Sequence, residues 1–136
     1  MPTLSISSEK ICYLIVKARE FDVQDLTADP DPGSNASDDR MVDVLEDHDD
    51  NPVVQEIKSF VAELSEEEKA DLMALMQLGR GDGTMEDWEA LRDQAYREHV
   101  DRTAAYLMGE PLLGDYLEEG LSQFGFSCAE FEIDRL

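Results

Sequence analysis

Apolar residues that recur at helical spacing are the feature that most constrains the fold of this chain. The clearest stripe follows Asn51 and Pro52, which are an N-cap residue and a proline suited to the first position of a helix. Its apolar residues stand at i, i+4, i+7, i+8 and i+11: Val53, Ile57, Phe60, Val61 and Leu64. This pattern predicts an amphipathic helix with one buried face.

Similar stripes and capping signals recur along the chain. Ser65 and Glu68 have the spacing of a capping box, and the helix that they open is apolar so widely around its axis that we expect it to be central and nearly buried. We expect further helices over about 8–22, 37–50, 66–78, 85–108 and 111–124, with a final turn or two after Ser127. Prolines and a glycine between residues 27 and 36 predict a long acidic loop there. No segment has a convincing strand pattern or an internal repeat. The sequence therefore predicts one all-α domain over residues 1–136, a compact bundle of five to six helices.

The chain is strongly acidic, and its acidic residues are concentrated in one segment. Eleven Lys and Arg residues stand against thirty-three Asp and Glu residues, which gives a net charge of −22. The segment between Glu20 and Glu56 holds thirteen of these acids and a single basic residue, Arg40. Such a field repels nucleic acid and anionic membranes and attracts basic surfaces. We therefore expect no direct binding of nucleic acid and no binding to membranes.

The acid-rich segment supplies the candidate interaction face. Like charges at i+3 and i+4 destabilise a helix, and docking on Lys and Arg residues of a partner would relieve that cost. A solvated surface is the simpler interpretation, and a weak cation site in the loop is a further alternative. The candidate face comprises Asp38, Asp39, Asp43, Glu46, Asp47 and Asp50.

Glycines between residues 79 and 84 form the most unusual stretch, for which three interpretations remain open. Phosphate binding is disfavoured because the loop lacks the P-loop lysine and carries Asp82. A calcium loop is disfavoured because Arg80 falls where an oxygen ligand is required. A tight interhelical turn closed by a Thr84 cap is the simplest interpretation. A ligand-binding or enzymatic pocket beside this loop would use Arg80, Asp82, Trp88 and His99.

Other reactive side chains form no recognisable catalytic or metal-binding motif. His48 has acidic neighbours and is expected to be a capping or salt-linked histidine, whereas His99 is expected to be packed or hydrogen-bonded. Cys12 and Cys128 are expected to be two free thiols, as is usual in a reducing cytoplasm. No catalytic residue, metal ligand or cofactor is predicted.

Several phrases of the sequence are similar to those of a known protein family. They are IVKAREF at residues 15–21, DPDPGSN at 29–35, LGRGDGT at 78–84 and PLLGDYLEEGL at 111–121. Together they resemble a family of small acidic proteins of unknown function, found mainly in alphaproteobacteria. The resemblance implies a bacterial cytoplasmic protein and implies no activity, cofactor or catalytic residue.

Two classes of function are compatible with the sequence. The leading hypothesis is a helical interaction or regulatory protein whose acidic face meets a basic protein surface, and mimicry of nucleic acid is a special case of it. The alternative is the ligand-binding domain or enzyme with its pocket beside residues 79–84. A homo-oligomer is a third possibility, with an apolar contact supplied by Trp88, Tyr106 and Tyr116.

The N-terminus has no signal-peptide pattern, and no apolar run is long enough to span a bilayer.

Overall fold

Helices make up the whole regular structure of the described residues, which are 3–28 and 51–129 of the computed structural model. The α-helices are α1 (Ser8–Ala28), α3 (Pro52–Ala62), α4 (Glu66–Arg80), α5 (Trp88–His99), α6 (Thr103–Met108) and α7 (Leu113–Gln123). Two short 3₁₀ helices, η1 (Met85–Asp87) and η2 (Val100–Arg102), flank α5. Strands are absent from these ranges. The all-α bundle that the sequence predicts is confirmed.

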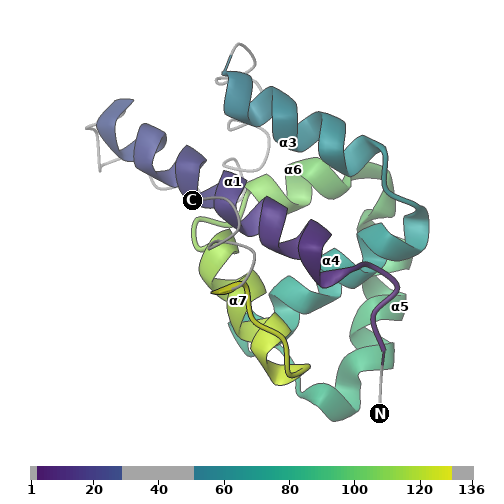
Figure 1. Cartoon of the computed structure of the whole chain (residues 1–136). Helices are drawn as coiled ribbons and strands as arrows, with labels where there is room; N and C mark the ends of the chain where they lie inside the picture. The colour runs from purple at the N-terminus through teal and green to yellow at the C-terminus, as the bar shows by residue number, and fades with distance from the viewer. Residues whose placement is uncertain (1–2, 29–50, 130–136) are drawn as a thin grey trace.

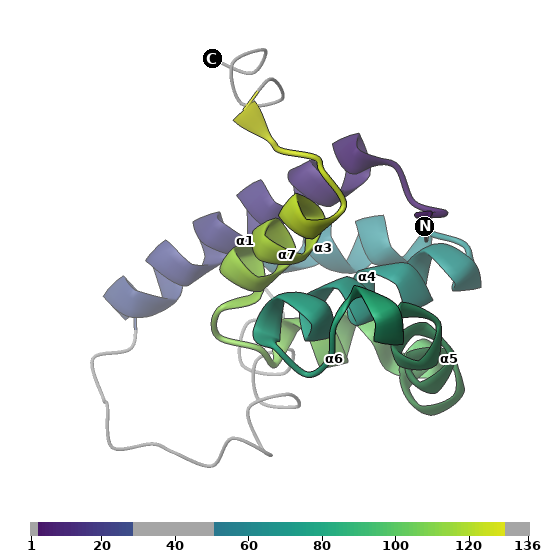
Figure 2. The same ribbon diagram turned by 90° about the horizontal axis from the view of Figure 1, so that it is seen from below.

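Helix α4 forms the centre of the bundle (Figures 1 and 2). Every residue from Ala70 to Leu78 is buried, so this helix is enclosed on all sides, as its broad apolar surface predicts. It packs against α7, α5 and α6, while α1 packs against α7 and α3. The N-cap serine Ser65 and Glu68 form the predicted capping box at its start.

Glycine allows α4 and α7 to approach closely at two positions. A Cβ atom on Gly79 would lie 1.8 Å from the backbone oxygen of Tyr116, and one on Gly120 would lie 2.4 Å from that of Leu75. Any larger residue would have to push the two helices apart. These two contacts set the spacing of the central helix pair.

Two predicted helices have different bounds in the structure. Helix α1 continues to Ala28 rather than ending near Asp22, because the first helix-breaking residue beyond Asp22 is Pro30. The predicted helix over 85–108 is interrupted at η2, where Arg102 has non-helical backbone angles. There the Thr103 hydroxyl donates a hydrogen bond to the Val100 carbonyl, a local alternative to the helical pattern. The predicted helix over 37–50 and residues 29–36 of the predicted loop lie outside the described residues.

The two cysteines form a disulfide, which corrects the expectation of two free thiols. Cys12 on α1 is bonded to Cys128, which follows α7, and their Cα atoms are 5.6 Å apart. Their separation of 116 residues in sequence hides this proximity, because only the packing of α1 beside α7 brings the two side chains together.

Candidate functional site

The turn between α4 and α5 has the geometry of a helix cap. Gly81 has a φ of 94° in the left-handed region, and its N–H donates to the Leu78 carbonyl at 3.2 Å. The N–H of Asp82 donates to the Gln77 carbonyl at 2.9 Å. Beyond the turn, the Thr84 N–H donates to the Asp87 carboxylate at 2.8 Å in a second capping box. These bonds support the interpretation of the glycines as a tight interhelical turn.

Arg80 at the end of α4 is paired with two carboxylates. Its Nε donates to Asp82 Oδ2 at 3.0 Å, and its Nη1 donates to Glu110 Oε2 at 2.9 Å. Hydrogen bonds to Asp82, and to Glu110 and Tyr106, raise the pKa of Arg80 although partial burial opposes the shift. The guanidinium charge is therefore balanced within the protein.

His99 contacts the same tyrosine, Tyr106. Its ring stacks on that of Tyr106 with the centroids 4.1 Å apart, and the Tyr106 hydroxyl accepts a hydrogen bond from Gln77 at 2.8 Å. The Nδ1 atom of His99 is buried and has no hydrogen-bond partner among the described residues. Burial lowers the pKa of His99, with a smaller contribution from Arg102 in the same direction and an opposing one from Glu98.

Three of the four predicted pocket residues therefore form one contact group, in which Arg80 and His99 contact Tyr106 and Asp82 contacts Arg80. Trp88 does not join them: it is 2% exposed and packs edge-on against Phe124, with the ring centroids 4.8 Å apart. The sequence analysis did not identify Gln77 and Glu110 as members of this group. The amide side chain of Gln77, inside the apolar run of α4, could have indicated a buried polar contact there. We call the resulting group the Tyr106 cluster: Gln77, Arg80, Asp82, His99, Tyr106 and Glu110.

The polar groups of the Tyr106 cluster are bonded largely to one another, which limits the ligands that they could bind and the reactions that they could catalyse. The positive charge of Arg80 faces Asp82 and Glu110, and the Tyr106 hydroxyl is bonded to an amide. Within residues 3–28 and 51–129, no three His, Cys, Asp or Glu side chains are placed to hold a metal ion. The contacts of the cluster fasten the end of α4 to α6 and to the chain that follows it.

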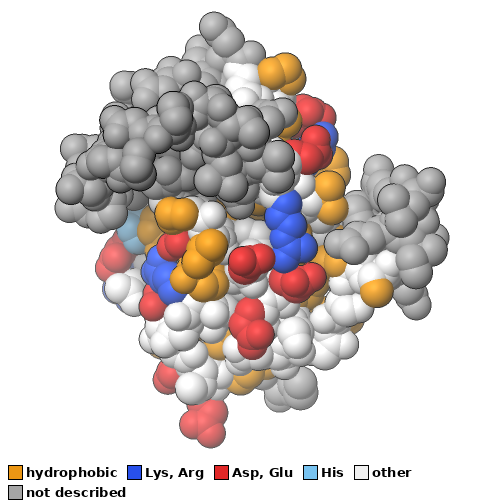
Figure 3. Space-filling model, turned by 90° about the vertical axis from the view of Figure 1, so that its left-hand side faces the viewer, with side chains coloured by type: hydrophobic (Ala, Val, Ile, Leu, Met, Phe, Trp, Pro, Cys, Tyr) orange, Lys and Arg blue, Asp and Glu red, His pale blue; other side chains and the backbone are white. Residues whose placement is uncertain are grey.

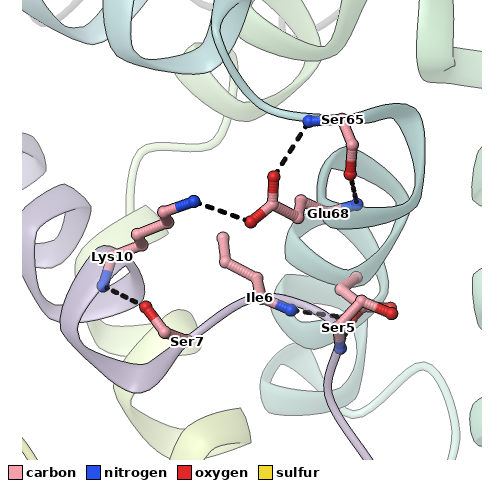
Figure 4. A network of polar contacts seen from close by, with 7 residues as sticks. Ser5, Ile6, Ser7, Lys10, Ser65 and Glu68 are labelled. Atoms are coloured by element: carbon pink, nitrogen blue, oxygen red, sulfur yellow. Dashed lines mark hydrogen bonds and ion pairs between the residues drawn. The ribbon is translucent and has the colours of Figure 1, made fainter.

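A second polar network ties the N-terminal segment to α4 (Figure 4). Lys10 Nζ donates to Glu68 Oε2 at 2.8 Å, and the other oxygen of Glu68 accepts the N–H of Ser65 at 2.9 Å. Hydrogen bonds from Lys10 and Ser65 lower the pKa of Glu68. One turn further along α4, the buried carboxylate of Asp71 accepts the N–H groups of Ser5 and Ile6. The start of the chain is thus held against the central helix.

An apolar groove of about 420 Å³ lies beside this segment. Its apolar lining comes from Leu4, Ile6, Phe124 and Phe126, so both ends of the described chain contribute to it. Phe126 is 48% exposed, and the described residues that line the groove include no charged side chain. It is separate from the Tyr106 cluster, with which it shares no lining residue.

The basic side chains of the described protein are largely occupied by ion pairs. Figure 3 shows one face of the molecule, on which blue side chains are bordered by red ones. Arg19, for example, lies 3.0 Å from both Asp115 and Glu118, and Lys17 lies 3.1 Å from Glu56. Carboxylates within 3.4 Å are found for six cations: Lys10, Lys17, Arg19, Arg80, Arg92 and Arg97.

The predicted interaction face lies in the part of the chain without a described structure. Asp38, Asp39, Asp43, Glu46, Asp47, Asp50 and also His48 fall between residues 29 and 50. The structure therefore neither groups nor separates these carboxylates. No described helix is both long and apolar enough to cross a membrane.

Comparison with known proteins places the chain in a family. Neither the search of curated proteins nor that of solved structures found a significant match. A protein family described as "Protein of unknown function (DUF3775)" matches residues 54–126, from the third residue of α3 to just beyond α7. The match includes the central helix α4 and the whole Tyr106 cluster, and it covers more than half of the chain. The chain therefore belongs to the DUF3775 family of proteins of unknown function.

Proposed function

We propose that this protein is an interaction or regulatory module that binds a basic surface of a partner protein. The observation that carries the proposal is that basic side chains of the described protein form ion pairs with carboxylates of the same chain. Lys10, Arg19 and Arg80 each lie within about 3 Å of a carboxylate of their own chain. These cations are paired with acids of their own chain and are not presented to a partner. The net charge of −22 therefore gives the protein a negative electrostatic field.

The acid-rich segment is the proposed contact surface. It holds over half of the net negative charge in just over a quarter of the sequence. A concentrated charge steers association with an oppositely charged surface more effectively than the same charge spread evenly. We place the contact on the candidate face Asp38, Asp39, Asp43, Glu46, Asp47 and Asp50.

We also propose that the protein is cytoplasmic, because its sequence resembles those of small bacterial cytoplasmic proteins. Disulfides in that compartment are mostly transient or redox-sensing. The bond between Cys12 and Cys128 is consequently expected to be present in only part of the cellular population.

Affinity capture from a lysate of the native host, at low and high salt, tests the proposed contact. The test variant changes the six acids of the candidate face to Asn or Gln. A control variant removes the same number of charges from six exposed carboxylates on other elements: Glu63, Glu67, Glu86, Glu89, Asp101 and Glu119. We expect the wild type and the control to retain a basic partner at low salt, and the test variant to lose it.

The two variants separate a local contact from a general effect of net charge. Equal loss of the partner in both variants would contradict the proposed face. Capture that is indifferent to salt, or capture of partners without a basic surface, would contradict the electrostatic proposal as a whole.

A further inference from the structure

A disulfide holds the chain after α7 against α1. Cys12 lies in the second turn of α1, and Cys128 lies five residues beyond the end of α7. Both side chains are almost fully buried, and each belongs to the apolar core. Figure 2 shows the chain leaving α7 and running past α1. The bond therefore joins two parts of the molecule that no other covalent link brings together.

Cys128 is the only buried residue in the described segment 125–129. Gly125, Phe126, Ser127 and Ala129 are all exposed. The N–H groups of Gly125 and Phe126 only complete the end of α7, by donating to Ser122 and Leu121, and that of Ala129 donates to the neighbouring Ser127 hydroxyl. Among the described contacts, the disulfide is thus what fixes residues 127–129 to the bundle.

The bundle has other contacts that do not depend on this bond. Helix α7 packs on α4 through the close approach of Gly120 to Leu75, and on α1 through the pairing of Arg19 with Asp115. The N-terminal segment is held separately by Asp71. Loss of the disulfide would therefore free residues 127–129 without removing the contacts that hold the helices together.

We propose that the Cys12–Cys128 disulfide is a redox switch that controls the position of the segment 127–129. In the oxidised form the segment is fixed next to Phe126, which forms one wall of the apolar groove beside Leu4 and Ile6. In the reduced form the segment leaves α1, the chain after Phe126 no longer holds this side chain in place, and the thiol of Cys12 becomes accessible. The inference is independent of the proposed partner.

The reduction is a dithiol–disulfide exchange. Because both sulfurs are buried, the reductant reaches them when the segment opens locally. A thiolate of a dithiol reductant then attacks one sulfur, a mixed disulfide forms, and the other cysteine leaves as a thiolate that takes up a proton. The second thiol of the reductant then attacks the mixed disulfide. Two electrons and two protons pass from the reductant, which becomes a disulfide, to Cys12 and Cys128, which become thiols. The reverse reaction with a disulfide oxidant restores the bond.

Nuclear magnetic resonance on the full chain, before and after addition of dithiothreitol, tests this proposal. On reduction we expect backbone order parameters of residues 127–129 to fall from about 0.85 to below about 0.6, while the amides of α4 keep their chemical shifts. Native alkylation with a maleimide, followed by mass spectrometry, should modify neither cysteine before reduction and both after it. Cys128→Ser should reproduce the reduced state without reductant, and Ser127→Ala should behave as the wild type.

Four results would overturn the switch. They are free thiols that persist after treatment with a disulfide oxidant, a disulfide that reacts only after unfolding, order parameters of 127–129 that stay high on reduction, and loss of the α4 signals together with those of the segment. The last result would identify the bond as a structural cross-link of the whole bundle. If Cys128→Ser fails to fold, the reduced wild-type protein still decides between these outcomes.

Discussion

The carboxylate of Asp71 on α4 is completely buried and accepts a hydrogen bond from Nε of Arg92 on α5. The same carboxylate also accepts the backbone N–H groups of Ser5 and Ile6. One acidic side chain in the centre of the bundle therefore joins α4, α5 and the N-terminal segment. A buried charge is tolerated only when partners replace the water that it loses, and here three donors do so.

Replacing Asp71 should destabilise the protein strongly. Asp71→Ala leaves two backbone donors and the partly buried Arg92 without their acceptor, so we expect a loss of about 3–5 kcal/mol in the free energy of unfolding. Urea denaturation followed by circular dichroism measures it. The control is Asp93→Ala, which removes an exposed carboxylate paired with Arg97 and should cost less than about 0.5 kcal/mol. Similar losses in the two variants would contradict the role assigned to Asp71.

Gly79 should tolerate no side chain. The Cβ atom of Gly79→Ala would collide with the backbone oxygen of Tyr116, so α4 and α7 must separate, at a cost of about 1–3 kcal/mol or more. Gly81→Ala is the informative comparison, because Gly81 has a positive φ but open space around it and should lose only about 1 kcal/mol. Thermal unfolding of both variants checks the order. A Gly79 variant as stable as the Gly81 variant would exclude the tight crossing.

His99 should make the stability of the protein depend on pH. Because burial lowers the pKa of His99 in the folded state, the unfolded chain binds the proton more readily. The contribution of the neutral imidazole is present above the unfolded pKa of about 6.5 and is lost as the pH falls through this value toward the folded pKa. We expect His99→Phe, which keeps an aromatic ring next to Tyr106, to reduce this loss.

Nuclear magnetic resonance gives the direct check on His99. A titration of its imidazole signals should return a pKa below 6.5 in the folded protein. A value at or above 6.5 would show that the ring is solvated or paired with Glu98, and would remove the physical basis for the predicted loss of stability.

The capping box at the start of α4 should contribute a small and separable amount of stability. Ser65→Ala removes the hydroxyl that accepts the N–H of Glu68 at 3.1 Å, and should cost about 1 kcal/mol. Ser122→Ala, at an exposed position inside α7, is the matched control and should change the free energy of unfolding by less than about 0.5 kcal/mol. Equal effects in denaturant unfolding would mean that the cap does not stabilise α4.

The sequence predicted those features that depend on neighbouring residues. The stripe from Val53 to Leu64, the Asn51 cap and the Ser65 capping box all appear where the spacing placed them. A helix and its cap are decided within about four residues, so their signals can be read along the chain. The prediction was less accurate at helix ends, as the longer α1 and the interruption at η2 show.

The amino-acid sequence by itself determined the fold class, the central position of α4 and the strong negative charge. Only the tertiary structure decided that Cys12 is bonded to Cys128, that Tyr106 contacts both Arg80 and His99, and that Asp71 pairs with Arg92. The physical reason is distance along the chain. Helical periodicity shows which face of each helix is buried, whereas partners from different elements depend on how those faces pack against one another.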